Sequence, residues 1–175
     1  MSAHIFLDES KAGGYLVAAA VVLPRDLGPA RTTLRGMVLR GQARLHFTKE
    51  SDSRRRTLLS AMESLGARIL LYDASAIRPA HEARAACLEA VVSDAADLGA
   101  HRLVLEQDDS VLTADRRLLY QQVRKAEIED ILTYEHMRPS AECLLWIPDA
   151  IAWCWSRGGA WRRRAKPMIE TVRAL

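Results

Sequence analysis

Cysteine and long hydrophobic runs are both scarce in this sequence. It has three cysteines and no C-x-x-C pair, so neither a disulfide framework nor a zinc ribbon is expected, and a reducing, cytoplasmic location fits best. The longest strongly apolar stretch, Tyr15 to Pro24, is too short to cross a bilayer. Asp8 and Glu9 interrupt the apolar run near the start, and no basic segment precedes it, so neither a signal peptide nor membrane association is predicted.

Excess charge is also small, since the formal net charge is +3, and the whole-molecule field does not indicate a nucleic-acid binder. The arginines are nevertheless clustered, at Arg54 to Arg56 and again near the end of the sequence, where Arg162, Arg163 and Arg164 are the candidates for contact with nucleic acid. Solvated helix faces rich in arginine would give the same pattern. Tryptophans near the second cluster could stack on bases or pack in the core.

The length and composition are those of one ordinary globular domain. The chain has 175 residues, of which 49% are hydrophobic and 27% are charged. That size supports a substantial core without disulfides or a structural metal. We therefore expect a single domain over residues 1–175, with a C-terminal helical segment over about 147–175.

The order of apolar runs predicts the fold class. Residues 3–8 and 15–23 are short, apolar and joined by a Gly-Gly turn, which is typical of an antiparallel hairpin. Helical and strand patterns then alternate: we expect helices over 26–40, 51–66, 79–98 and 113–126, and strands over 67–73, 101–107 and 131–135. The prediction is an α/β fold, with a mixed sheet of an N-terminal antiparallel hairpin plus parallel strands, flanked by helices.

Acidic residues end several of these predicted strands. Asp8-Glu9, Asp73 and Glu106 with Asp108 all follow apolar runs, and ligand sites in α/β sheets lie outside the carboxyl ends of strands. If the strands are parallel neighbours, their terminal acids converge. A single strand-end acid is more typical of an ordinary loop, so the set carries more information than any one member.

Asp149 is unusual for another reason, because it lies inside the apolar segment LLWIPDAIAWCW. A buried carboxylate is costly unless it is paired, hydrogen-bonded or bound to a cation. It follows Pro148, so it could also simply complement the free N–H groups of a first helical turn.

Converging carboxylates would suit Mg²⁺ or Mn²⁺, which favour oxygen ligands. Such ions can activate water and stabilise the leaving oxygen of a phosphodiester. His46, in LHFTKE, could orient the substrate, transfer a proton or bind metal, although a histidine satisfied by hydrogen bonds beside Phe47 explains the pattern equally well. His136, in YEHMRP, is a second candidate.

Three local motifs resemble the domain-of-unknown-function 3800 family, whose members look like ribonuclease H in fold. FLDES, followed by the hydrophobic run YLVAAAVVLP, is similar to the family's opening hairpin. LHFTKE looks like its histidine-containing extended segment, and LLWIPDAIAWCW is similar to its closing helix. The sequence departs from the family at Lys11, which follows FLDES, and at Trp146 and Pro148 within LLWIPDAIAWCW. Glu106 or Asp108 is also an imperfect match to the family's acid after the penultimate strand.

The resemblance implies a ribonuclease-H-like domain that acts as a metal-dependent nuclease. Asp8, Glu106 and Asp149 would hold Mg²⁺ or Mn²⁺, with Glu9 and His46 in support, while Asp108 and Asp73 remain rivals of Glu106 as third carboxylate. The alternative is a catalytically inactive module of the same fold that binds nucleic acid or a protein partner, because each departure from the family lies beside a site position. Self-association also stays open.

Overall fold

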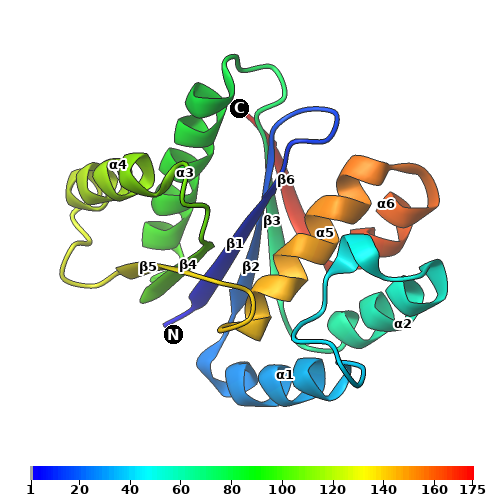
Figure 1. The fold of residues 1–175 in the computed structure, drawn as a ribbon. Helices are drawn as coiled ribbons and strands as arrows, with labels where there is room; N and C mark the ends of the chain where they lie inside the picture. The colour runs from blue at the N-terminus through cyan, green and yellow to red at the C-terminus, as the bar shows by residue number, and fades with distance from the viewer. Residues whose placement is uncertain (1) are drawn as a thin grey trace.

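The computed structural model describes residues 2–175, which form one six-stranded sheet with helices on both faces (Figure 1). The strands are β1 (His4–Ser10), β2 (Leu16–Val22), β3 (Arg68–Asp73), β4 (Arg102–Glu106), β5 (Thr133–Met137) and β6 (Ile169–Ala174). The helices are α1 (Pro24–Gly36), α2 (Asp52–Glu63), α3 (Ala80–Asp97), α4 (Leu112–Lys125), α5 (Trp146–Arg157) and α6 (Gly159–Ala165). Short 3-10 helices are η1 (Phe47–Lys49), η2 (Cys143–Leu145) and η3 (Lys166–Met168).

The predicted hairpin and the mixed sheet are confirmed. The strand order is β5-β4-β1-β2-β3-β6. β2 runs antiparallel to both of its neighbours, β1 and β3, whereas β4 is parallel to β1, β5 to β4 and β6 to β3. All seven residues of β2 are buried, which explains why its sequence reads as a continuous apolar run without alternation.

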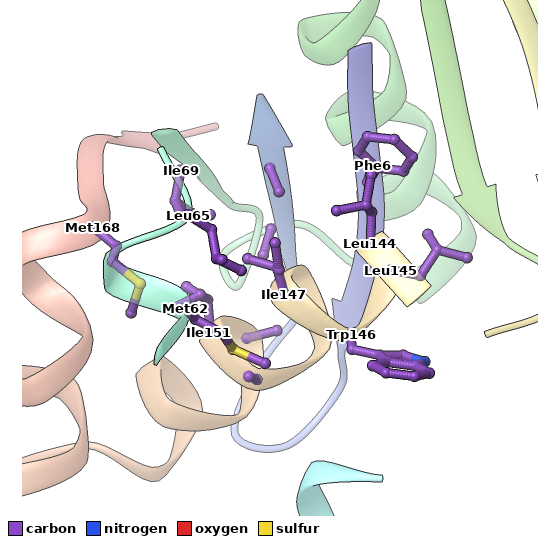
Figure 2. Close-up of a cluster of buried hydrophobic side chains, with 14 of the residues drawn as sticks. Phe6, Met62, Leu65, Ile69, Leu144, Leu145, Trp146, Ile147, Ile151 and Met168 are labelled. Atoms are coloured by element: carbon purple, nitrogen blue, oxygen red, sulfur yellow. The ribbon is translucent and has the colours of Figure 1, made fainter. Parts of the chain in front are cut away.

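Two hydrophobic layers cover the sheet. On one face, Phe6, Val104 and Ile69 pack against α1, α2, α5 and α6, and Figure 2 shows part of this cluster, including Ile147 and Ile151 of α5. On the other face, a second cluster of strand residues packs against α3 and α4. Because successive side chains of a strand alternate between faces, the parity of a residue in β1 decides which layer it joins.

The predicted C-terminal helical segment is wrong for the last residues. α5 and α6 are helical, but Ile169–Ala174 forms the edge strand β6, paired in parallel with β3. Five of its six residues are exposed, so the segment lacks the buried apolar run that marks β1, β2, β3 and β4.

Candidate functional site

Asp8 and Glu106 lie at the carboxyl ends of two adjacent parallel strands. β1 and β4 are in register as far as the pair Leu7 and Leu105, one residue before each acid. Phe6 and Val104, two residues before them, face the α5 layer, so the pleat turns Asp8 and Glu106 to that same face. The charge of Glu106 is close enough to Asp8 to raise the pKa of Asp8.

Asp149 comes to the same place from α5, more than a hundred residues away from Asp8 in sequence. It stands in the first turn of this helix, and its charge raises the pKa of Asp8. Two backbone amides hold the pair: Glu9 N–H donates to Asp8 Oδ1 at 2.7 Å, and Phe47 N–H donates to Asp149 Oδ2 at 3.4 Å. Three segments of the chain therefore deliver three carboxylates to one face of the sheet.

The closeness of these acids has a clear electrostatic effect. Burial raises the pKa of Asp8 well above its ordinary value, and the negative charges of Glu106 and Asp149 raise it further. Burial and the charge of Glu106 raise the pKa of Asp149 to about 6, although the Phe47 amide and Arg44 oppose the shift. Like charges held together in a partly buried site disfavour full ionisation unless a cation neutralises them.

The donor set fits a hard divalent cation better than any other metal. Three carboxylates supply oxygen ligands only, and Mg²⁺ commonly uses one or two carboxylates with water and substrate phosphate completing the shell. Within residues 2–175, no three acidic, histidine or cysteine side chains form a ready-made ligand set. A metal here would therefore take some of its ligands from water or from a bound phosphate.

His46 lies beside this group, at the start of η1. Burial lowers its pKa, and so do the positive charges of Arg44 and Lys49, while Glu106 opposes them. Its Nδ1 atom is buried and has no hydrogen-bond partner among the residues that the structure describes. The predicted alternative, a histidine satisfied by hydrogen bonds, therefore does not hold for this nitrogen.

Arg44 is a residue that the sequence reasoning missed. It is half-buried, and its charge acts on both Asp149 and His46. It lies in the irregular segment between α1 and η1, where no periodic pattern marks a position as inward-facing. Only its place two residues before His46 could have drawn notice.

Glu9 does not join the carboxylate group, contrary to prediction. Because it is the next residue after Asp8 on the strand, its side chain faces the opposite layer. There it forms an ion pair with Arg84 of α3 and accepts a hydrogen bond from the hydroxyl of Tyr15. Lys11 Nζ lies 3.0 Å from its other oxygen. Glu9 is thus already neutralised by two cations.

Arg84 connects Glu9 to a second buried acid, Asp115 of α4. Arg84 donates two hydrogen bonds to Asp115, each 2.7 Å long, and His136 Nε2 lies 2.8 Å from the same carboxylate. Burial alone would raise the pKa of Asp115, but Arg84 and His136 outweigh it and the pKa is lowered. His136, the second histidine candidate, therefore belongs to this network and not to the carboxylate group.

Of the two rivals of Glu106, Asp73 lies elsewhere, whereas Asp108 lines the same hollow as Asp8 and Glu106 but is hydrogen-bonded within its own loop. β2 separates β3 from β1, and Asp73 accepts the Ser75 amide at 2.9 Å in the turn after β3. Asp108 accepts both the amide and the hydroxyl of Ser110, and its side chain is 41% exposed. Glu106 is the strand-end acid that meets Asp8 and Asp149.

The two arginine clusters differ in what their side chains do. Arg54 donates to the carbonyl of Met37 at 2.6 Å, and Arg55 donates to the carbonyls of Phe47 and Thr48 while lying over the Trp153 ring. Arg54 therefore holds the end of α1 and Arg55 holds η1, and the interpretation of this cluster as a phosphate contact is not supported for these two side chains. Arg162, Arg163 and Arg164 are exposed along α6.

The tryptophans also differ in their contacts, because some pack in the core and one borders the surface. Trp146 is buried, and its indole N–H donates to the carbonyl of Pro139 at 2.8 Å. Trp153 packs edge-on against Phe47 and Trp161. These contacts are those of core residues, as one of the two interpretations expected, while Trp155 borders a surface hollow.

No protein-family model and no curated protein sequence matches the chain. Among solved structures, it is similar to the RNase HII from Archaeoglobus fulgidus, determined as a complex with PCNA, with a TM-score of 0.60 and 17% sequence identity over 95% of this chain and 77% of that one. The fold is ribonuclease-H-like. The resemblance to the domain-of-unknown-function 3800 family stays a prediction.

The ribonuclease-H-like fold explains why the acids meet, because β1 is central and β4 is its parallel neighbour. At 17% identity the likeness establishes architecture and not chemistry. In the part of the chain that the structure describes, no helix is long and apolar enough to span a membrane.

Proposed function

We propose that this protein hydrolyses phosphodiester bonds in nucleic acid, with Asp8, Glu106 and Asp149 holding Mg²⁺ or Mn²⁺. The observation that carries the proposal is the meeting of three carboxylates from β1, β4 and α5 on one face of the sheet. The likeness in fold to an RNase HII supports the same class of reaction.

Two of the three carboxylates are held for this role by backbone amides. The Glu9 amide fixes Asp8, and the Phe47 amide fixes Asp149, so both side chains would enter the complex with little loss of freedom. A divalent cation would supply an activated water and neutralise charge on the phosphate. Without such a cation, three adjacent carboxylates would repel a phosphodiester.

His46 and Arg44 would complete the site from the opposite side. His46 has a lowered pKa, so its imidazole is neutral at pH 7 and able to accept a proton from water or from the substrate. Arg44 would place a positive charge near the phosphate, since its charge already acts on Asp149.

The test is cleavage of labelled DNA and RNA oligonucleotides with Mg²⁺, with Mn²⁺ and with EDTA. We expect cleavage only with a divalent ion, and a loss on the order of 100-fold for Asp8→Asn, Glu106→Gln and Asp149→Asn, the scale seen when one contact to developing charge is removed. Asp108→Asn is the control, because Asp108 lies outside the group, and it should retain full activity. Equal activity of Asp8→Asn and the parent protein would end the proposal.

The second candidate function is a module that binds nucleic acid or a protein partner without catalysis. The lack of a ready-made ligand set within residues 2–175 favours it. It predicts nucleic-acid binding that falls steeply with salt, needs no divalent ion and is accompanied by no cleavage. Protein partners and self-association stay predictions, which a measurement of mass in solution tests.

A further inference from the structure

Two adjoining hollows are lined by residues of the turn between β1 and β2 and of the C-terminal end of α5. Their volumes are about 150 and 330 Å³, and both are lined by Ala12, Gly13 and Ser156. Trp155 and Arg162 border the first, and Trp153 and Arg157 border the second. We call the two hollows together the turn groove.

The turn groove lies beyond the carboxylate group along β1 and α5. Ser10 comes two residues after Asp8 and therefore points to the same face of β1. Ser156 comes seven residues after Asp149, which is two helical turns or about 10 Å along α5. The hydroxyls of Ser10 and Ser156 are hydrogen-bonded at 2.9 Å, so strand and helix still touch at this distance from the acids.

Charge and an oriented guanidinium plane suit the turn groove to nucleic acid. Arg157 and Arg162 are both exposed. Arg162 donates two hydrogen bonds to the carbonyl of Trp155, at 3.1 and 2.8 Å, and its guanidinium lies over the Trp155 ring, 4.5 Å from the centroid. A base can stack on a guanidinium plane that is held in this way. The N–H groups of Arg162 that remain free can donate hydrogen bonds to a phosphate.

The opposite wall leaves room for a ligand backbone. Gly13 has a φ of +78°, and a Cβ added to it would meet no atom within 4 Å. Asp73 contributes one negative charge to the lining, but its carboxylate already accepts the Ser75 amide. With Arg157 and Arg162 present, the lining keeps an excess of positive charge.

We infer that the turn groove binds single-stranded nucleic acid one or two nucleotides away from the bond at the carboxylate group. At about 150 and 330 Å³, the hollows offer room for single groups and not for a duplex, and unpaired bases are free to reach aromatic and guanidinium surfaces inside a concavity. The position relative to the scissile bond rests on the proposed function; the binding itself does not.

The binding test uses fluorescein-labelled single strands of twelve nucleotides, in RNA and DNA form, and the matching duplexes, all in EDTA. We expect Arg157→Glu and Arg162→Glu to weaken single-strand binding about tenfold and to lower the salt slope by about 1 each, as loss of one phosphate contact does. Arg117→Glu is the matched control, because it makes the same charge change at an exposed position of α4 outside the lining, and should change affinity about twofold or less. Binding of either the RNA or the DNA strand supports the inference if Arg157→Glu and Arg162→Glu weaken that binding.

Three outcomes would overturn the inference. Equal effects of Arg162→Glu and Arg117→Glu would show a general electrostatic field and no groove, and tighter binding of the duplex would remove the single-strand claim. If the protein cleaves nucleic acid, an unchanged KM in Arg157→Glu and Arg162→Glu would also overturn the inference. It would leave the nuclease proposal intact. Groove-dependent binding without cleavage would instead support the turn groove and count against the nuclease.

Discussion

Asp8 and Glu9 are neighbours in sequence but belong to two separate charge groups on opposite faces of the sheet. Asp8 meets Glu106 and Asp149 under α5, whereas Glu9 is ion-paired with Arg84 of α3. One hydrogen bond joins the groups, from the Glu9 amide to Asp8 Oδ1. The first group carries unneutralised negative charge, and the second is internally paired.

The pairing of Glu9 predicts a stabilising role without direct metal contact. Glu9→Gln should lower the free energy of unfolding by about 2 kcal/mol, because Arg84 loses one of its two carboxylate partners in a mostly buried setting. The affinity for Mn²⁺, measured by calorimetry on the folded protein, should stay within about threefold, below the change expected when an outer-shell partner is lost. A larger loss of Mn²⁺ affinity would place Glu9 in the metal site after all.

For Asp8, in contrast to Glu9, removal of the carboxylate charge should stabilise the protein at high pH. Folding raises the pKa values of Asp8 and Asp149, in the case of Asp149 to about 6. The stabilisation that comes from protonating these groups is therefore fully present below their ordinary pKa near 4. It is lost as the pH rises through the pKa values of the folded state. In EDTA at pH 8, Asp8→Asn should therefore melt at a higher temperature than the parent, and the gap should shrink at pH 5.

Divalent ions give the control for that experiment. Millimolar Mg²⁺ at pH 8 should raise the Tm of the parent and leave that of Asp8→Asn nearly unchanged, since only the parent offers the full acid group. A parent protein that melts above Asp8→Asn in EDTA at pH 8 would show that the acids do not repel each other.

Asp115 predicts a loss of stability with the reverse dependence on pH. Its pKa is lowered in the fold, so its contribution is present above the ordinary value near 4 and is lost as pH falls through the lowered one. Asp115→Asn should cost about 3 kcal/mol at pH 7, because Arg84 and His136 lose a buried charged acceptor. Chemical denaturation at pH 7 and pH 3 should show the gap narrowing in acid; exposed Asp109 supplies the control Asp109→Asn.

Arg55 predicts a structural effect that its neighbour Arg56 lacks. Arg55→Ala removes hydrogen bonds to the carbonyls of Phe47 and Thr48 and the stack on Trp153, so it should destabilise the protein by about 2 kcal/mol. Arg56→Ala, an exposed change one position away, should stay within about 0.5 kcal/mol of the parent. Equal denaturation curves for the two variants would contradict this role of Arg55.

Much of the fold could be predicted because the central strands are buried. β1, β2, β3 and β4 are apolar runs bounded by turn residues or charge, and the acids that end them were visible as a set. The exposed edge strand β6 was missed, because Ile169–Ala174 carries no burial pattern.

The site was harder to predict, because no local sequence pattern specifies the order of the strands in the sheet. Nothing local tells that β4 and not β3 lies beside β1, which is what separates Glu106 from Asp73. The face of Glu9 could have been inferred, since the period of two along a strand forbids Asp8 and Glu9 from sharing a face. Arg84 gave no signal, because it lies in an alanine-rich helix where an arginine reads as exposed.

The most direct test is a crystal structure grown with Mn²⁺, examined by anomalous scattering around Asp8. The account predicts an ion ligated by oxygens of Asp8 and Asp149, with Glu106 in contact directly or through water, and an Asp8→Asn crystal without that ion. An empty position in saturating Mn²⁺, with Asp149 turned onto Arg44 instead, would contradict it.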